Sequence, residues 1–110
     1  MNCKIGKLIG IPFPYTDLTT NKKRPVLVIT TPDKRGDFIC VAVTSVPTDE
    51  FAIIINNDSV LDGCLPKQSW IRCDKVFTLN ESIVIKEYGT LADEVLVRVR
   101  HELCSYLACP

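Results

Sequence analysis

Three short segments place polar side chains where the surrounding strand-like sequence is apolar, and they are where this chain could do chemistry. They are the loop from Asp17 to Arg24, the pair Thr44-Ser45, and the stretch from Ser69 to Asp74. An arginine donates two parallel hydrogen bonds to a phosphate and never loses its charge. Hydroxyl groups orient a bound anion, and a carboxylate can accept a proton. These residue types could therefore hold an anion and move a proton.

The clearest spacing signal is the pair Arg72 and Asp74. Residues two apart in a strand share a face, so these side chains project side by side, roughly 7 Å apart along the strand. Trp70 lies on the same face. On spacing alone, a surface ion pair worth about 0–1 kcal/mol is favoured over a catalytic pair. Thr44-Ser45 equally suits a strand that ends in a turn, and the basic run 22–24 suits a solvated loop.

Composition limits the classes of protein to which the chain can belong. Its 110 residues, 46% of them apolar, predict one domain spanning 1–110 with a real core. Thirteen Lys and Arg balance 13 Asp and Glu, which argues against a general DNA-coating protein. No apolar run approaches the roughly 18 residues of a membrane span, and no secretory signal is recognisable. We expect a cytoplasmic protein that does not bind membranes.

The six cysteines predict neither a metal site nor disulfides. They include no C-x-x-C pair, and His101, expected to be an exposed helix residue, is the only histidine. Cys40 lies within an apolar run, where cysteine behaves as a small buried hydrophobe. We therefore expect free thiols, no metal and no cofactor.

The elements that must position these residues are several short strands and one helix. Leu91, Val95, Val99, Leu103 and Leu107 recur every four residues and predict a C-terminal helix, with Thr90 and Asp93 as its capping box. Apolar and β-branched runs predict the strands. Ser69 to Leu79 forms one bent strand or two short ones. The pattern is mainly β, a barrel-like sheet carrying a terminal helix, with the other strands expected at 5–13, 25–30, 38–45, 51–55 and 83–87.

Several of these segments, in order, resemble the motifs of the PemK/MazF toxin family. Residues 11–29 resemble its first signature, an opening strand and polar loop followed by Arg24-Pro25 and an apolar strand. Residues 41–45 resemble the second motif, and Ser69 to Asp74 the third. Ile83 to Leu107 fits the closing strand and helix. The similarity covers nearly the whole chain, and the ordered set is more specific than any one motif.

The resemblance implies a small SH3-like barrel with a C-terminal helix, which pairs as a homodimer. It also implies the toxin of a type II toxin–antitoxin system, a metal-independent, sequence-specific endoribonuclease that cleaves single-stranded RNA by attack of the 2′-OH. Its expected partners are single-stranded RNA and a cognate acidic antitoxin. Promoter DNA is expected to bind only the complex with that antitoxin.

The same resemblance implies roles for individual residues. Arg24 and Thr44 match the family's main catalytic pair, with Ser45 beside them, and Arg72 and Asp74 match an Arg-x-Asp implicated in catalysis in the PemK/Kid branch. No histidine lies near Tyr15 to Asp17, so a His-assisted mechanism is not carried over. The residues expected to contact RNA are Tyr15, Asp17, Lys22, Lys23 and Trp70.

Two alternatives from other functional classes stay open at this point. One is a toxin of the same barrel class that poisons gyrase by binding. The other is a nucleic-acid-binding module that regulates transcription and does not cleave.

Overall fold

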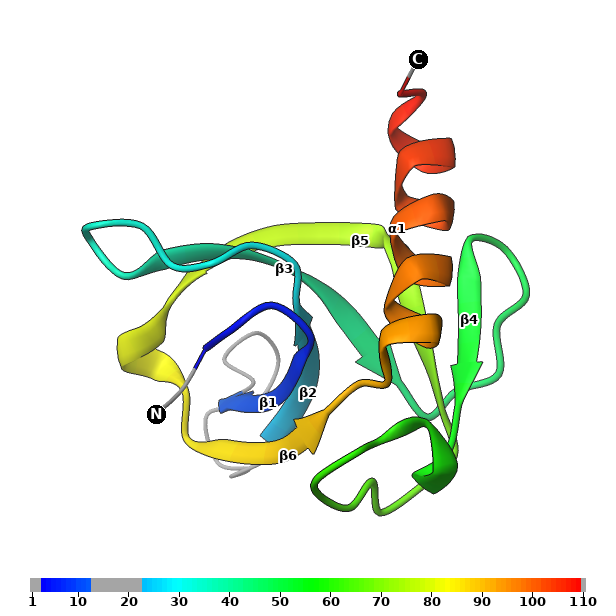
Figure 1. Ribbon diagram of the computed structural model, residues 1–110, viewed down its shortest axis with the longest axis horizontal. Coiled ribbons are helices and arrows are strands. Elements are labelled where there is room, and N and C mark those ends of the chain that lie inside the picture. The colour runs from blue at the N-terminus through cyan, green and yellow to red at the C-terminus, as the bar shows by residue number, and fades with distance from the viewer. Residues whose placement is uncertain (1–2, 13–22, 110) are drawn as a thin grey trace.

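The strand-forming runs build one antiparallel sheet in the computed structural model, which describes residues 3–12 and 23–109. Its six strands lie in the order β4-β5-β3-β2-β1-β6. The sheet curls into a half-barrel, and α1 stands beside β4 and β5 at its open end (Figure 1). The elements are β1 (Lys7–Pro12), β2 (Lys23–Val28), β3 (Asp37–Thr44), β4 (Ala52–Ile55), β5 (Ser69–Asn80), β6 (Lys86–Thr90) and α1 (Asp93–Leu107).

The curled sheet buries apolar side chains on both of its faces. In β2, Leu27 belongs to the cluster under α1, whereas Val26 and Val28 belong to the cluster on the opposite face. In β3, Val41 and Val43 join Leu27, and Cys40 joins Val26. Burial on both faces explains why β2 lacks alternation in sequence and confirms the prediction that it is a central strand.

Helix α1 covers one edge of the core with the predicted apolar stripe. Val95, Leu96, Val99 and Leu103 are buried. The prediction is wrong for the last residue of the stripe, since the Leu107 side chain is 55% exposed beyond the last strand that could cover it. The predicted capping box is also wrong, because Thr90 still pairs within β6. Ala92 is the N-cap residue and makes no side-chain capping bond, so the helix begins three residues after Thr90.

The predicted strand at 83–87 is displaced toward the C-terminus. The Asn80 side chain accepts a hydrogen bond from the Ser82 backbone N–H (2.9 Å), which starts a 3₁₀ turn over Glu81–Ile83. Pairing with β1 then begins only at Lys86. The predicted bent strand is a single one, β5, whose register with β3 is interrupted between Arg72 and Val76.

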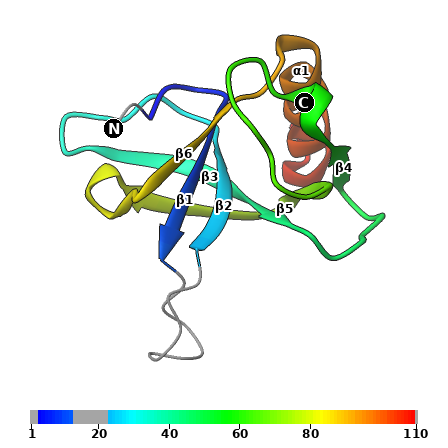
Figure 2. The same ribbon diagram turned by 90° about the horizontal axis from the view of Figure 1, so that it is seen from below.

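The loop between β4 and β5 is held firmly against β6. The Cys64 N–H donates to the Tyr88 carbonyl (2.9 Å), and the Leu65 N–H donates to Oδ1 of Asn57 (2.8 Å). Gly63 packs so closely on the Tyr88 backbone that a Cβ there would overlap the Tyr88 carbonyl oxygen. The contacts of Gly63 and Cys64 hold the loop against β6, and the Leu65 bond ties the loop to itself (Figure 2).

The cysteines are free thiols. Cys40 is fully buried, as predicted, and burial raises the pKa of its thiol to about 12. Burial likewise raises the pKa of Cys73 to about 11. No helix in ranges 3–12 and 23–109 is long and apolar enough to span a bilayer.

The close approach at Gly63 gives a stability prediction. Gly63→Ala must displace the Tyr88 backbone, so we expect its free energy of unfolding to fall by about 1–3 kcal/mol, as for other overpacked sites. Denaturant unfolding measures the change. Gln68→Ala, an exposed change in the same loop, should stay within about 0.5 kcal/mol of the wild type. Equal stability of all three proteins would contradict the close packing.

Candidate functional site

The pairing of β2, β3 and β5 brings most of the expected catalytic residues onto one face of the sheet. Thr44 lies opposite Trp70, and Ala42 opposite Arg72. Val26 is the first residue of β2 that pairs with β3, opposite Ala42, and Arg24 lies two residues away from it on the same face of β2. Paired residues share a face, so Thr44–Trp70 and Val26–Ala42–Arg72 form two adjacent rows, and Asp74 contacts Arg72 on that face. We call Arg24, Thr44, Trp70, Arg72 and Asp74, which share this face, the strand row.

Arg72 and Asp74 form the ion pair that their spacing predicts. Nε of Arg72 donates to Oδ1 of Asp74 (3.2 Å), and a terminal guanidinium nitrogen donates to Oδ2 (2.8 Å). The two side chains are 31% and 20% exposed. The hydrogen bond from Arg72 holds the pKa of Asp74 below its ordinary value, and the same bond raises the pKa of Arg72. Asp74 is therefore a charged carboxylate in a fixed orientation.

Thr44 has the structural role that a strand end suggests. Its Oγ1 accepts a hydrogen bond from the Val46 backbone N–H (3.1 Å), which closes the turn after β3. The hydroxyl hydrogen can still be donated to a bound anion. Ser45 is exposed and lies just beyond the end of β3.

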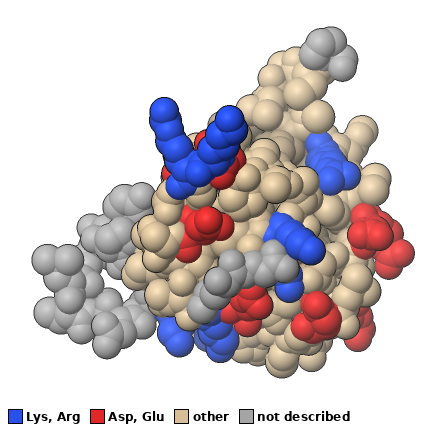
Figure 3. All heavy atoms as spheres, turned by 60° about the vertical axis from the view of Figure 1, so that its left-hand side comes forward, with Lys and Arg blue, Asp and Glu red and all other residues tan. Residues whose placement is uncertain are grey.

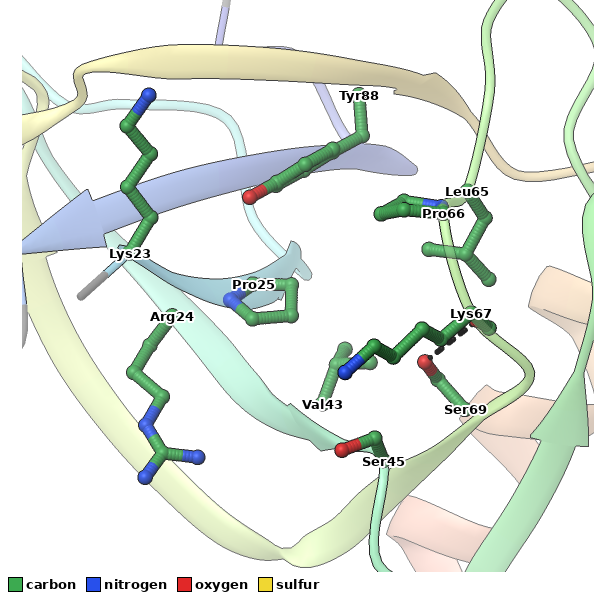
Figure 4. A pocket seen from close by; sticks show the side chains of 10 residues that line it. All are labelled: Lys23, Arg24, Pro25, Val43, Ser45, Leu65, Pro66, Lys67, Ser69 and Tyr88. Atoms are coloured by element: carbon green, nitrogen blue, oxygen red, sulfur yellow. Dashed lines mark hydrogen bonds between the residues drawn. The ribbon is translucent and has the colours of Figure 1, made fainter.

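A polar cavity of about 270 Å³ opens where β2 begins and β3 ends, between them and the loop that precedes β5 (Figure 4). The side chains of Ser45 and Lys67 point across it toward the Arg24 side. None of the described residues that line it is acidic, although three are cations. We call it the cationic cavity; it is lined by Lys23, Arg24, Pro25, Val43, Ser45, Leu65, Pro66, Lys67, Ser69 and Tyr88.

The structure divides the sequence-predicted residues into two groups that share Arg24. Lys23, Arg24 and Ser45 line the cationic cavity. Thr44, Trp70, Arg72 and Asp74 lie in the strand row and do not line it. Arg24 belongs to both groups, and its Nε atom is shielded from solvent. The expected RNA contacts Tyr15, Asp17 and Lys22 fall outside the described residues.

Two residues of the cavity, Lys67 and Tyr88, were not predicted from the sequence, whereas Ser69 begins one of the three polar segments singled out there. Ser69 is 5% exposed and donates its hydroxyl to the Lys67 carbonyl (2.9 Å). Lys67 lies in a loop and Tyr88 in a strand distant in sequence. Only the fold of the β4–β5 loop onto β6 brings them to Arg24.

One face of the molecule carries charges of both signs. On the face drawn in Figure 3, Lys and Arg side chains are interspersed with Asp and Glu and form no continuous basic surface. This pattern agrees with the zero net charge of the chain. An anion is therefore not attracted to this face in general.

Comparison with known proteins agrees with this arrangement. The sequence model of the PemK-like, MazF-like toxins of type II toxin–antitoxin systems matches residues 4–107. This chain belongs to that family. Among curated proteins, none matches the sequence.

Solved structures of family toxins share the fold. A MazE–MazF crystal structure from Deinococcus radiodurans is 20% identical with a TM-score of 0.77, covering 97% of each chain. An endoribonuclease in complex with its cognate antitoxin, from a mycobacterial species, is 14% identical with a TM-score of 0.75 over 97% of this chain and 96% of that chain. The Mycobacterium tuberculosis toxin MazF-mt6 is 15% identical with a TM-score of 0.72 over 94% and 98%. The predicted SH3-like barrel with a terminal helix is confirmed.

The Arg72–Asp74 pair predicts a pH-dependent contribution to stability. Because the folded pKa of Asp74 is lowered, the pair stabilises the fold above the ordinary Asp value of 3.8, and the contribution is lost as pH falls through the folded value. At pH 7, the free energy of unfolding measured in urea should be up to about 1 kcal/mol higher for the wild type than for Asp74→Asn. The difference should shrink below about pH 4. Asp49→Asn, at an exposed position, is the control; a difference that grows in acid would contradict the lowered pKa.

Proposed function

We propose that this chain is a metal-independent endoribonuclease toxin that cleaves single-stranded RNA at short sequences. The observation that carries the proposal is the position of Arg24, which belongs both to the cationic cavity and to the strand row with Thr44, Arg72 and Asp74. A phosphate bound by Arg24 would therefore lie at the boundary between the cationic cavity and the face of the sheet that carries Thr44 and Asp74. The related mycobacterial structures that are endoribonucleases support the same activity.

The reaction uses the nucleophile that RNA itself provides. The 2′-oxygen attacks the adjacent phosphorus, the bond to the 5′-oxygen of the next nucleotide breaks, and a 2′,3′-cyclic phosphate forms. Negative charge grows on the phosphate oxygens in the transition state. Arg24 stabilises that charge through its planar pair of donors, and Thr44 or Ser45 orients the phosphate or the 2′-OH.

Two protons must move in this reaction. One leaves the 2′-OH as it attacks, and another reaches the departing 5′-oxygen. Asp74 is the carboxylate of the strand row and accepts the first, in the orientation set by Arg72. The lowered pKa of Asp74 keeps it ionised and at the same time makes it a weak base, so the proton transfer contributes less than a base with a pKa near 7 would.

The toxin acts as a homodimer and is held inactive by an acidic antitoxin. A cavity of about 270 Å³ takes only a small part of a multi-nucleotide site, so a second copy must extend the RNA-binding surface. The Deinococcus structures are MazE–MazF complexes, which supports an antitoxin partner here. Promoter DNA is bound only by the toxin–antitoxin complex.

Assembly is tested by sedimentation. We expect a species of twice the 12.3 kDa chain mass at micromolar concentration. A monomer alone under those conditions would remove the shared RNA surface from the proposal.

The activity is tested by incubating the purified protein with a long single-stranded RNA in EDTA. Cleavage supports the proposal. Retention of RNA without cleavage favours a nucleic-acid-binding module, and neither retention nor cleavage favours a toxin that binds a protein such as gyrase.

Arg24→Ala should cleave RNA at least about 10²–10³-fold more slowly than the wild type, which is the effect of removing one preorganised hydrogen-bond donor. Arg24→Lys should also be impaired, because an ammonium keeps the charge but makes no planar two-point contact. The melting temperatures of the three proteins should be similar, since Arg24 lies at the start of β2 and outside the buried clusters. An Arg24→Ala protein that is destabilised yet cleaves normally would take Arg24 out of the site.

A further inference from the structure

The cationic cavity has two walls that the cleavage reaction described above does not use. One is Lys67 in the β4–β5 loop, and the other is Tyr88 of β6, with the rings of Pro25 and Pro66 between them (Figure 4). Neither residue belongs to the strand row. The described residues that line the cavity include three cations and no acid, which suits an anion, whereas an aromatic ring and two prolines suit a flat apolar group.

Lys67 is positioned before any ligand arrives. Pro66 restricts the backbone on one side of it, and the buried Ser69 hydroxyl bonds its carbonyl (2.9 Å) on the other. The same loop is tied to β6 through the Cys64 N–H and the Tyr88 carbonyl. Its exposed ammonium therefore reaches into the cavity from a fixed backbone, which lowers the entropy lost on binding.

Tyr88 is held as a rigid wall. Its ring lies over β1 at Gly10, where a Cβ would come within 3.2 Å of the Tyr88 Cε2 atom. Lys86 Nζ lies 5.0 Å from the ring centroid. Burial raises the pKa of Tyr88, so its hydroxyl stays protonated and able to donate a hydrogen bond. Glycine at position 10 thus leaves room for a fixed aromatic group beside the cavity.

We propose that the cationic cavity binds one unpaired nucleotide of the RNA, next to the phosphate that is cleaved. Lys67 binds the phosphate of that nucleotide, and its base lies against Tyr88 and Pro66. The volume of about 270 Å³ is just below the roughly 300 Å³ at which small-molecule pockets begin, which suits a single nucleotide unit. Because Arg24 is shared, the bound nucleotide is adjacent to the reacting phosphate. The inference rests on the proposed function.

Lys67 and Tyr88 are therefore expected to affect different properties of RNA binding. Lys67 makes a sequence-independent contact, so it contributes to affinity and to salt dependence. Tyr88 contacts a base, so it contributes to the choice of the cleaved sequence. Both are positioned away from the bond that breaks, and neither should alter the chemical step strongly.

Lys67→Met tests the phosphate contact while keeping the length of the side chain. We expect KM to rise about tenfold with kcat within about threefold, and the slope of log affinity against log salt to fall by about 0.7, the value for one contact to a single strand. Lys34→Met is the matched control, since Lys34 is exposed in the turn at the opposite end of β3. An unchanged KM and salt slope, or the same change in the control, would overturn the role of Lys67.

Tyr88→Phe and Tyr88→Leu test the base contact. Sequencing the ends of the cleaved RNA should show an unchanged preference for Tyr88→Phe or a shift limited to one position. Tyr88→Leu should lose the preference at that one position next to the cut and keep it elsewhere. A cut-site pattern that is identical in all three proteins, with folding verified by melting temperature, would overturn the role of Tyr88.

Binding of a 2′-O-methyl RNA, which lacks the nucleophile, separates the two proposals. If the wild type binds this RNA but cleaves no RNA, weaker binding by Lys67→Met still supports the nucleotide site while the proposed nuclease fails. If the wild type cleaves RNA and Lys67→Met binds the 2′-O-methyl RNA normally, the nucleotide site fails while the nuclease stands. If the wild type neither binds nor cleaves, both are overturned.

Discussion

The site depends on the register of β3, which pairs with β2 on one side and β5 on the other. That register aligns Val26, Ala42 and Arg72, and it sets Thr44 opposite Trp70 on the face that also carries Arg24. A slip by one residue would turn every β3 side chain to the opposite face. It would also take Val41 and Val43, which are 0% and 2% exposed, out of the cluster under α1 and onto the face of the strand row, so the free energy of core burial opposes it. The hydrophobic core and the strand row are thus consequences of one pairing.

The cationic cavity depends on a second contact, the packing of the β4–β5 loop against β6. The Cys64–Tyr88 hydrogen bond and the close approach of Gly63 hold that loop. It carries Lys67 to the place where β2 presents Lys23 and Arg24. A chain with no net charge thereby gathers three cations around one cavity, and Arg24 connects them with the strand row.

Much of the fold could be predicted because periodicity reports burial directly. The β-branched runs predicted β2 and β3, and the four-residue spacing of Val95, Val99 and Leu103 predicted α1. The predicted element boundaries were wrong where other hydrogen bonds took their place. The turn that Asn80 starts moves the beginning of β6 toward the C-terminus. Thr90 pairs within a strand instead of capping the helix. Residues within short motifs, such as Arg72 and Asp74, were found from their spacing. Lys67 and Tyr88 carry no local pattern, because only loop docking makes them neighbours.

Cleavage by the proposed mechanism uses the 2′-OH of RNA and groups of this protein. The most direct measurement is the chemistry of the ends produced from a single-stranded RNA in EDTA. We expect a 2′,3′-cyclic phosphate on one fragment and a 5′-hydroxyl on the other, because the 2′-oxygen forms the new bond to phosphorus. Fragments with a 3′-hydroxyl and a 5′-phosphate, or cleavage that begins only after a divalent ion is added, would contradict this mechanism.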